Sequence, residues 1–349
     1  MKRQNGAIDL VKFLFALLIV AAHYIAEYAT GRIPALLDIG SSVYVVVVPF
    51  FFACSGYFLF RKVFANEETG KETIKSYLRR IGLMYGLWSV VYVGLQTAAW
   101  LRHGATAESW ARYILNALTY STYKTIWFLP ALCIGVGLFW RIYRKKGIKR
   151  ALIWSAVLYV LGCVGASYSF LLQDSATISG ALHGYEYVFV STRNGLFHGF
   201  PLVALGALIA YQEQRGSTIK PATCWILTIL TGVAFVAEAL VLKLFCDAVN
   251  VNTLFMLVPF TYFLIRTCLT IPVTSGKGLR WMRGMSTTVF LSQRLWLSAL
   301  PELLPGTFFA GVLYGNPYLG LCWTLAATLL TAAALQWVGK RSRLIGAMC

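Results

Sequence analysis

The sequence predicts an all-α integral membrane protein, a bundle of about ten transmembrane helices with both termini on the cytoplasmic side. Three observations lead to this prediction. Hydrophobic residues make up 58% of the 349 residues and charged residues only 13%, against about 25% charged in an ordinary soluble domain. The apolar residues are grouped in runs long enough to cross a bilayer, and the basic residues alternate between successive connections. A soluble enzyme and a disordered chain are therefore excluded.

Ten apolar runs have the length of a membrane span. A helix rises about 1.5 Å per residue, so about 20 apolar residues cross a hydrocarbon core about 30 Å thick. The expected spans are 8–28, 42–60, 81–101, 126–143, 151–168, 194–212, 222–242, 251–270, 285–303 and 317–337, of which the fifth and ninth have the weakest signals. No connection between them exceeds 25 residues. We therefore expect residues 1–349 to form a single transmembrane domain without a soluble domain.

The positions of the 31 Lys and Arg residues orient these spans. The two ends and the even-numbered connections carry 22 of them, the odd-numbered connections carry six, and three lie inside spans. Cytoplasmic connections are enriched in Lys and Arg, which places both termini in the cytoplasm. The net charge of +18 is then mainly a topology signal. Because the basic residues are dispersed over short segments, nucleic acid is not an expected partner.

The first apolar run is interpreted as a span and not as a cleaved secretory signal. It lacks a small-x-small cleavage site and carries Lys12 and His23 inside it. The eight cysteines are scattered, mostly within or beside apolar spans, and form no CxxC or Cys/His spacing. No metal site is therefore expected, and the cysteines are interpreted as small buried hydrophobic residues.

Lys12 and His23 are the most informative residues of the sequence. They lie eleven residues apart, so on a helix they share one face to within about 20° and are separated by about 16 Å along the axis. An ionisable group inside a membrane costs a few kcal/mol and usually marks a functional path. The structural alternative, a Lys that reaches the interface and a His hydrogen-bonded between helices, remains open. Asp9, one turn before Lys12, is a possible partner for its ammonium.

Five segments in order resemble motifs of the acyltransferase family 3 membrane proteins. The pair Lys12 and His23 is similar to the family's Arg/Lys-x10-His motif. The other four matches are VPFFFACSGYFLF (48–60), SYLRRIGLMYGLW (76–88), IWFLPAL (126–132) and RNGLFHGFPLVALG (193–206). Each pattern is weak alone, and together they cover about the first 210 residues. The resemblance is closest to the membrane half of VanT-type serine racemases.

The resemblance implies a membrane enzyme of the bacterial cytoplasmic membrane. Family members O-acylate sugars of the cell envelope, which implies acyl-CoA as donor substrate, with acetyl-CoA expected, and an envelope glycan or lipid-linked saccharide as acceptor. No permanently bound cofactor is implied. The membrane half of the VanT-type proteins is associated with serine uptake, so a transporter for serine or a similar small polar solute is the alternative. A homo-oligomer is left open.

Two features depart from the family pattern. Many members have a His-Pro in a late span, where this sequence reads FLSQRLWL (290–297), with Gln293 and Arg294 in its place. A function that needs that His is therefore in doubt. We also expect neither a C-terminal esterase-like domain nor a racemase domain, so the activity is expected to reside in the membrane.

The implied reaction assigns roles to individual residues. A sugar hydroxyl needs a base as it attacks a thioester, and His23 is the candidate, with a covalent acyl-His intermediate as the alternative. Lys12, Arg61, Arg79 and Arg80 are candidates for the coenzyme A phosphates, and Ser55 for a hydrogen bond to the donor. Trp127 and Arg193 are candidates for acceptor binding.

Each of these roles has a structural alternative. Ser55 and Gly56 also suit ordinary helix packing, Trp127 also suits an interfacial aromatic belt, and Arg193 also suits a helix anchor. Glu238, Arg266 and Arg294 are costly if they face lipid, and an ion pair inside the bundle would satisfy them, with partners left open. His198 is the second candidate base.

Overall fold

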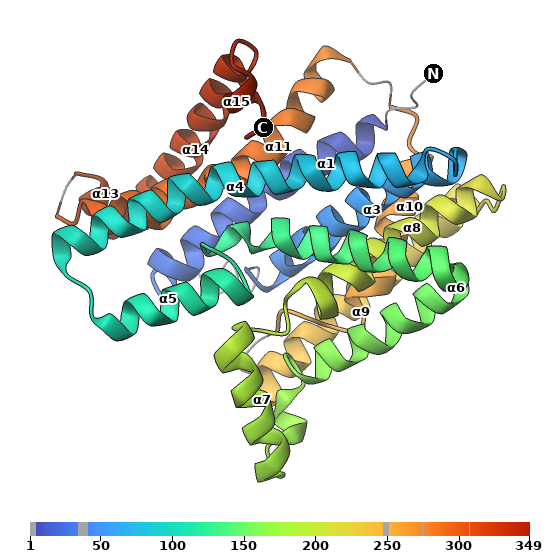
Figure 1. Cartoon of the computed structure of the whole chain (residues 1–349), viewed down its shortest axis with the longest axis horizontal. Coiled ribbons are helices and arrows are strands. Elements are labelled where there is room, and N and C mark those ends of the chain that lie inside the picture. Colours follow the sequence, from blue (N-terminus) through green and yellow to red (C-terminus); the bar gives the residue numbers. More distant parts are fainter. Residues whose placement is uncertain (1–4, 34–40, 247–250, 274–275, 307) are drawn as a thin grey trace. The chain divides into compact units, whose positions relative to one another are not determined.

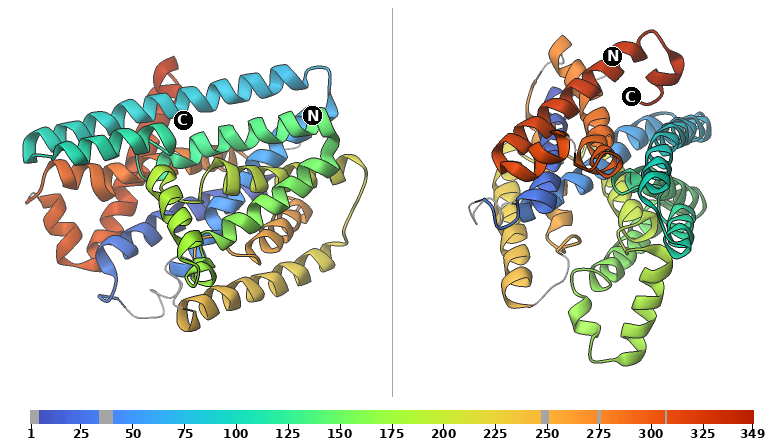
Figure 2. Two further views of the ribbon diagram at one scale, coloured as in Figure 1. Left: turned by 60° about the horizontal axis from the view of Figure 1, so that its bottom comes forward. Right: turned by 90° about the vertical axis from the view of Figure 1, so that its left-hand side faces the viewer.

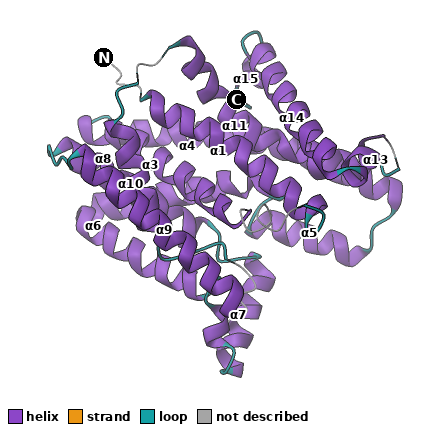
Figure 3. Ribbon diagram, turned by 180° about the vertical axis from the view of Figure 1, so that it is seen from behind, coloured by secondary structure: helices purple, strands orange, loops and turns teal. Residues whose placement is uncertain are grey.

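The computed structural model describes residues 5–33, 41–246, 251–273, 276–306 and 308–349, and every regular element there is a helix (Figures 1 and 3). Within this part of the chain, seven helical segments are long and apolar enough to cross a membrane: Gly6–Ala29, Tyr44–Ala65, Gly70–His103, Thr125–Val164, Gly195–Gln214, Pro221–Phe245 and Pro317–Gly339. The prediction of an all-α multi-pass membrane protein is confirmed.

The chain divides into two compact units that are each assembled from separate stretches of sequence. Unit 1 consists of Met1–Val47, Leu83–Trp127 and Val273–Cys349, and unit 2 of Val48–Gly82 and Phe128–Pro272. Because both units are discontinuous in sequence, neither is a domain attached to one end of the chain.

Unit 1 is built around three long helices and the second half of a fourth. Its elements are α1 (Gly6–Tyr24), a π-helix Ile25–Ala29, a 3-10 helix Ser41–Val46, the larger part of α4 (Gly70–His103), α5 (Ala107–Thr119), a 3-10 turn Thr125–Trp127, α11 (Lys277–Arg294), a π-helix Leu295–Ala299, α12 (Leu300–Leu303), α13 (Phe308–Gly315), α14 (Pro317–Gly339) and α15 (Arg343–Gly346). Local sequence determines where two of these helices begin. Asn5 caps α1 by accepting from the backbone N–H of Ile8. Asn316 caps α14 just before Pro317.

Contacts within unit 1 confirm the relative directions of four expected spans. Asp9 of α1 meets Arg283 of α11 and His23 meets Gln293, so these two helices run parallel. The pairs Tyr92–Leu291 and His103–Leu303 likewise make α4 parallel to the segment that begins with α11. The pairs Thr288–Gln336 and Trp296–Thr331 make α14 antiparallel to it. The first, third and ninth spans therefore run one way and the tenth the other, as the alternation predicts.

Unit 2 contains α3 (Val47–Ala65), the first part of α4, α6 (Phe128–Val164), a 3-10 turn Ser169–Leu172, α7 (Ala176–Phe189), a π-helix Gly195–Gly199, α8 (Phe200–Gln214), α9 (Pro221–Phe245) and α10 (Leu257–Thr270). Aromatic contacts Phe52–Phe128 and Phe60–Phe139 show that α3 and the start of α6 are parallel. In contrast, α9 and α10 pack side by side in antiparallel directions, because Thr228 meets Thr267 at 2.8 Å and Glu238 meets Phe255 at 2.7 Å (Figure 2). These directions also agree with the expected order of spans.

Several boundaries differ from the sequence prediction. The fourth and fifth spans form one long element, α6, which turns back at Gly147, where φ is 75° and ψ is 171°, a conformation that favours glycine (Figure 1). The eighth span is shorter than expected because its helix begins at Leu257. The ninth consists of α11, a π-helix and the short α12. The connections also contain α5 and α7, which the search for long apolar runs does not detect.

Small residues set the closest helix approach in unit 2. A Cβ on Gly56 or Gly206 would collide with the backbone of Val203 and of Ala53, respectively, so α3 and α8 meet backbone to backbone. Such approach gains van der Waals contact in a membrane, where helices have no hydrophobic drive to associate. Gly56 is the glycine of the SGY sequence, and its structural role as a packing residue is thereby observed.

We predict that Gly206→Ala destabilises the protein by about 1–3 kcal/mol, because the added methyl group overpacks the α3–α8 contact. Unfolding of the purified protein in lipid nanodiscs measures this. Gly137→Ala is the matched control, since a Cβ at Gly137 meets nothing within 4 Å. Equal stability of the two variants would contradict the close-packing interpretation.

Candidate functional site

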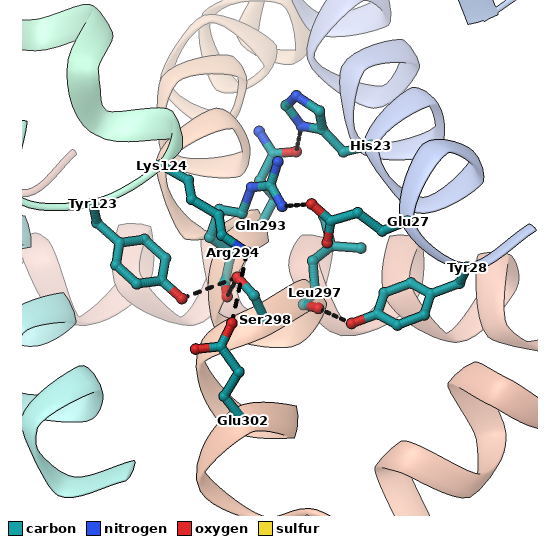
Figure 4. A network of polar contacts seen from close by, with 10 residues as sticks. All are labelled: His23, Glu27, Tyr28, Tyr123, Lys124, Gln293, Arg294, Leu297, Ser298 and Glu302. Atoms are coloured by element: carbon teal, nitrogen blue, oxygen red, sulfur yellow. Dashed lines mark hydrogen bonds and ion pairs between the residues drawn. The ribbon is translucent and has the colours of Figure 1, made fainter. Parts of the chain in front are cut away.

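His23 lies where α1 packs against α11. Its side chain is half-buried near the end of α1, and its Nδ1 is 2.8 Å from Oε1 of Gln293 (Figure 4). Gln293 is fully buried on α11, and its Nε2 donates to the backbone oxygen of Phe290 at 2.9 Å. The ring of Tyr44 meets the imidazole edge-on, with centroids 6.1 Å apart. The ring orientation of His23 is therefore set by a neighbouring helix.

An ion pair lies directly beyond this contact, one turn after His23 on the α1 side and one residue after Gln293 on the α11 side. Glu27 accepts from Nη1 of Arg294, the residue that follows Gln293 (Figure 4). The Arg294 side chain is 7% exposed and that of Glu27 is 28% exposed. Glu27 belongs to the π-helix Ile25–Ala29, and a second π-helix begins directly after Arg294. Single π turns of this kind are frequent at functional sites.

The polar contacts continue beyond this ion pair. Tyr28 donates to the backbone oxygen of Leu297, and the hydroxyls of Tyr123 and Ser298 are 3.0 Å apart (Figure 4). Burial raises the pKa of the Tyr123 phenol above its usual range, and the nearby Glu302 carboxylate acts in the same direction. The phenol therefore stays protonated at neutral pH. Lys124 pairs with Glu302 at 3.6 Å in a more exposed position.

The opposite end of the α1–α11 contact is also held by charge. Asp9, 3% exposed, accepts two hydrogen bonds from Arg283, of 3.0 Å from Nε and 2.8 Å from Nη2. Such a two-pronged contact fixes both helices in register. The expected neighbour of Asp9 on its own helix, Lys12, is half-buried one turn later.

The predicted geometry of Lys12 and His23 rests on an unbroken helix, and α1 is continuous from Gly6 to Tyr24. Both residues are half-buried. At 100° and about 1.5 Å per residue, they share one face and stand about 16 Å apart. Their roles in donor binding and proton transfer stay predictions.

The other donor-binding candidates belong to unit 2. Arg61 donates to the hydroxyl of Tyr57 at 3.1 Å, and that hydroxyl donates to Glu213 at 2.6 Å. Arg61 lies in the last turns of α3, so part of the expected 61–80 connection is helical. Arg79 and Arg80 are exposed on α4, and Arg80 lies over the ring of Tyr77. Ser55 is half-buried and hydrogen-bonds Tyr77.

The two acceptor candidates are in different units. Trp127 ends the 3-10 turn of unit 1, is 5% exposed, and stacks on Tyr120 with ring centroids 5.9 Å apart. Arg193 is half-buried in unit 2, just before the π-helix Gly195–Gly199. One face of the Trp127 ring is thus occupied by protein.

The partners of the remaining membrane charges are now visible. Glu238 accepts from the backbone N–H groups of Phe255 and Met256, each at 2.7 Å, and so holds the turn that precedes α10. Arg266 donates to the backbone oxygen of Ser217 at 3.2 Å. His198, the second candidate base, is 1% exposed among the rings of Phe52 and Tyr159. The described residues contain no group of three or more His, Cys, Asp or Glu placed to hold a metal ion.

Comparison with known proteins identifies the family. A model of the acyltransferase 3 type, described as an acyltransferase domain, matches residues 5–337. The chain belongs to the acyltransferase 3 family. The predicted resemblance is thereby confirmed, and at family level the protein is a membrane acyltransferase. The family match includes all of unit 2, most of unit 1 and all the candidate residues named above. No solved structure was found that matches the chain.

Curated proteins that are similar to this chain are named racemases and not acyltransferases. Two proteins of Enterococcus faecalis named amino-acid racemase are 25% and 27% identical over 60% and 62% of this chain. A serine/alanine racemase of Enterococcus gallinarum is 25% identical over 65% of it. The matched regions make up 29%, 31% and 32% of these three relatives, so the chain spans less than a third of their length.

Sequence reasoning missed part of the polar network. The sequence marks Gln293 only as a departure from the family pattern, and Arg294 also as a membrane charge that needs an ion pair with a partner left open; they contact His23 and Glu27 across the α1–α11 interface. Glu27 itself had a detectable signal, because it follows His23 by four residues and therefore lies on the same helix face. No pattern in the sequence indicates that Tyr123 and Lys124 join the network. Their places in it depend on tertiary contacts with Ser298 and Glu302.

We predict that Glu27→Gln destabilises the protein by about 1–3 kcal/mol, because it leaves the Arg294 charge unpaired; the partial exposure of Glu27 keeps the loss below that of a fully buried pair. The double variant with Arg294→Gln should lose less stability than the sum of the two single changes. Unfolding of all four proteins in nanodiscs measures the coupling. Additive losses would mean that the two charges do not interact.

Proposed function

We propose that this protein is a membrane O-acyltransferase that moves an acyl group from cytoplasmic acyl-CoA to a hydroxyl of an envelope glycan or lipid-linked saccharide. The observation that supports this most is His23, a half-buried imidazole held by Gln293 in a network of polar side chains on a membrane helix. The family match supports acyl transfer. The relatives from Enterococcus support a bacterial cytoplasmic membrane as the location.

The proposed chemistry needs one base. The acceptor oxygen attacks the thioester carbonyl carbon while the imidazole of His23 takes the hydroxyl proton. The carbon–sulfur bond then breaks, and the imidazolium returns the proton to the leaving coenzyme A thiolate. An imidazole suits both steps because its ordinary pKa lies near neutrality. A half-buried position limits competing hydrolysis by water.

Lys12 is proposed to meet the phosphates of the donor. Its ammonium is a point charge about 16 Å along α1 from His23, a span comparable to an extended pantetheine arm. The acyl group would then reach the imidazole while the phosphates stay at the cytoplasmic interface. Arg61, Arg79 and Arg80 are further candidates for the phosphates, Ser55 for the donor, and Trp127 and Arg193 for the acceptor.

A second candidate function is passage of a small polar solute, such as serine. The serine/alanine racemase relative and the mixed charges of Glu27, Arg294, Lys124 and Glu302 favour it. A zwitterion needs both an anionic and a cationic partner, and this network provides both.

We predict that His23→Ala lowers acyl-CoA turnover by about 10²–10⁴-fold, the contribution typical of a positioned base. The measurement follows labelled acetyl-CoA with purified protein in nanodiscs, with and without envelope saccharide. His183→Ala is the control, since His183 is an exposed histidine outside this network.

Serine uptake into proteoliposomes is measured in parallel. The proposal predicts acyl-CoA turnover that depends on His23, and no uptake above protein-free vesicles. Uptake of serine without binding or turnover of acyl-CoA would contradict it and favour the carrier.

A further inference from the structure

The buried amide of Gln293 has only one orientation that satisfies its neighbours. Its side chain is 0% exposed, and one end lies 2.9 Å from the backbone oxygen of Phe290, an atom that only accepts hydrogen bonds. The NH2 group must therefore face Phe290. The reversed amide would place two oxygens against each other in a buried site, which costs about as much as an unsatisfied polar group.

This orientation fixes the proton on His23. With the NH2 group directed at Phe290, the Oε1 atom of Gln293 faces Nδ1 of His23 at 2.8 Å. A carbonyl oxygen has no proton to give, so Nδ1 must be the donor. A neutral imidazole has a single N–H group, and the proton on Nδ1 leaves the lone pair on Nε2.

The surrounding contacts keep Gln293 in register with His23. The next residue, Arg294, pairs with Glu27 one turn beyond His23, and Arg283 pairs with Asp9 at the other end of the same interface. Sliding or rotation of α11 against α1 would break both ion pairs. Gln293 itself is uncharged and therefore orients the ring without adding a charge beside it.

We propose that Gln293 is a positioning residue that holds His23 as the Nδ1-protonated tautomer, so that Nε2 accepts the proton of the acceptor hydroxyl. This inference rests on the proposed function for the reaction step, and on the hydrogen-bond geometry alone for the tautomer. The wrong tautomer would direct an N–H group at the hydroxyl and could not remove its proton. Loss of tautomer control by another enzyme's catalytic His lowers turnover strongly.

The tautomer is measured directly by nitrogen NMR. The chain has four histidines, so protein labelled with 15N-histidine and placed in bilayers gives few signals, and His23→Asn identifies those of His23. Above the pKa of the ring, the wild type should show a protonated Nδ1 and an unprotonated Nε2. Gln293→Leu should lose this preference, and Gln293→Glu should keep it, because a protonated carboxyl group donates to Phe290 in place of the amide and presents its other oxygen to Nδ1.

Gln336→Leu is the matched control. Gln336 also makes a partly buried contact between helices, donating to Thr288 at 3.0 Å, at a position away from His23. Its loss should leave the His23 signals unchanged. Thermal unfolding of each variant is recorded first, so that the spectra compare folded proteins.

Turnover tests the second half of the proposal. Gln293→Leu should lower kcat for acyl-CoA by at least about tenfold with little change in KM, and Gln293→Glu should recover part of the loss. A proton on Nε2 in the wild type, or a spectrum that Gln293→Leu leaves unchanged, would overturn the inference whatever the activity. The expected tautomer in a protein that turns over no acyl-CoA would instead overturn the proposed function and support the role of Gln293 in holding the ring.

Discussion

The contact between α1 and α11 is the interaction on which the site depends. Charged and amide side chains inside an apolar environment must satisfy one another, because no water is available to do so. At one end Asp9 is bound by Arg283, and at the other Glu27 is bound by Arg294. Between these two pairs the helices are fixed in direction and register. The imidazole of His23 is consequently held in place by Gln293 instead of rotating freely.

Unit 2 is held together by a different physical principle. Its helices α3, α6 and α8 approach through glycines and aromatic rings, with Gly56, Gly135 and Gly206 at positions where a Cβ would collide with backbone. Among its polar side chains, Glu238 accepts from two backbone N–H groups just before α10, and Tyr57 links Arg61 to Glu213. The ionisable residues that suit proton transfer in unit 1 and the small residues that suit tight packing in unit 2 thus belong to separate stretches of the sequence.

The helical spans were predictable because apolar length is a local property, and the direction of each helix follows from simple alternation across the bilayer. The Lys12–His23 face was predictable for the same reason, since helix geometry fixes it. The residues that these side chains contact on α11 were not predictable. Arg283, Gln293 and Arg294 lie some 270 residues from Asp9, His23 and Glu27, and no local rule links such positions. The eighth span was predicted too long because its irregular start does not change composition, and the π-helix inside the ninth leaves no signal in composition for the same reason.

The central claim is that His23 and Gln293 act as one unit in acyl transfer. The most direct measurement is acyl-CoA turnover by the wild type, the two single variants His23→Ala and Gln293→Leu, and the double variant, all in nanodiscs of one lipid composition. If Gln293 acts through His23, its loss lowers turnover in the wild-type background and has no further effect once His23 is alanine. An equal loss in both backgrounds would contradict the account, because Gln293 would then act independently of the imidazole.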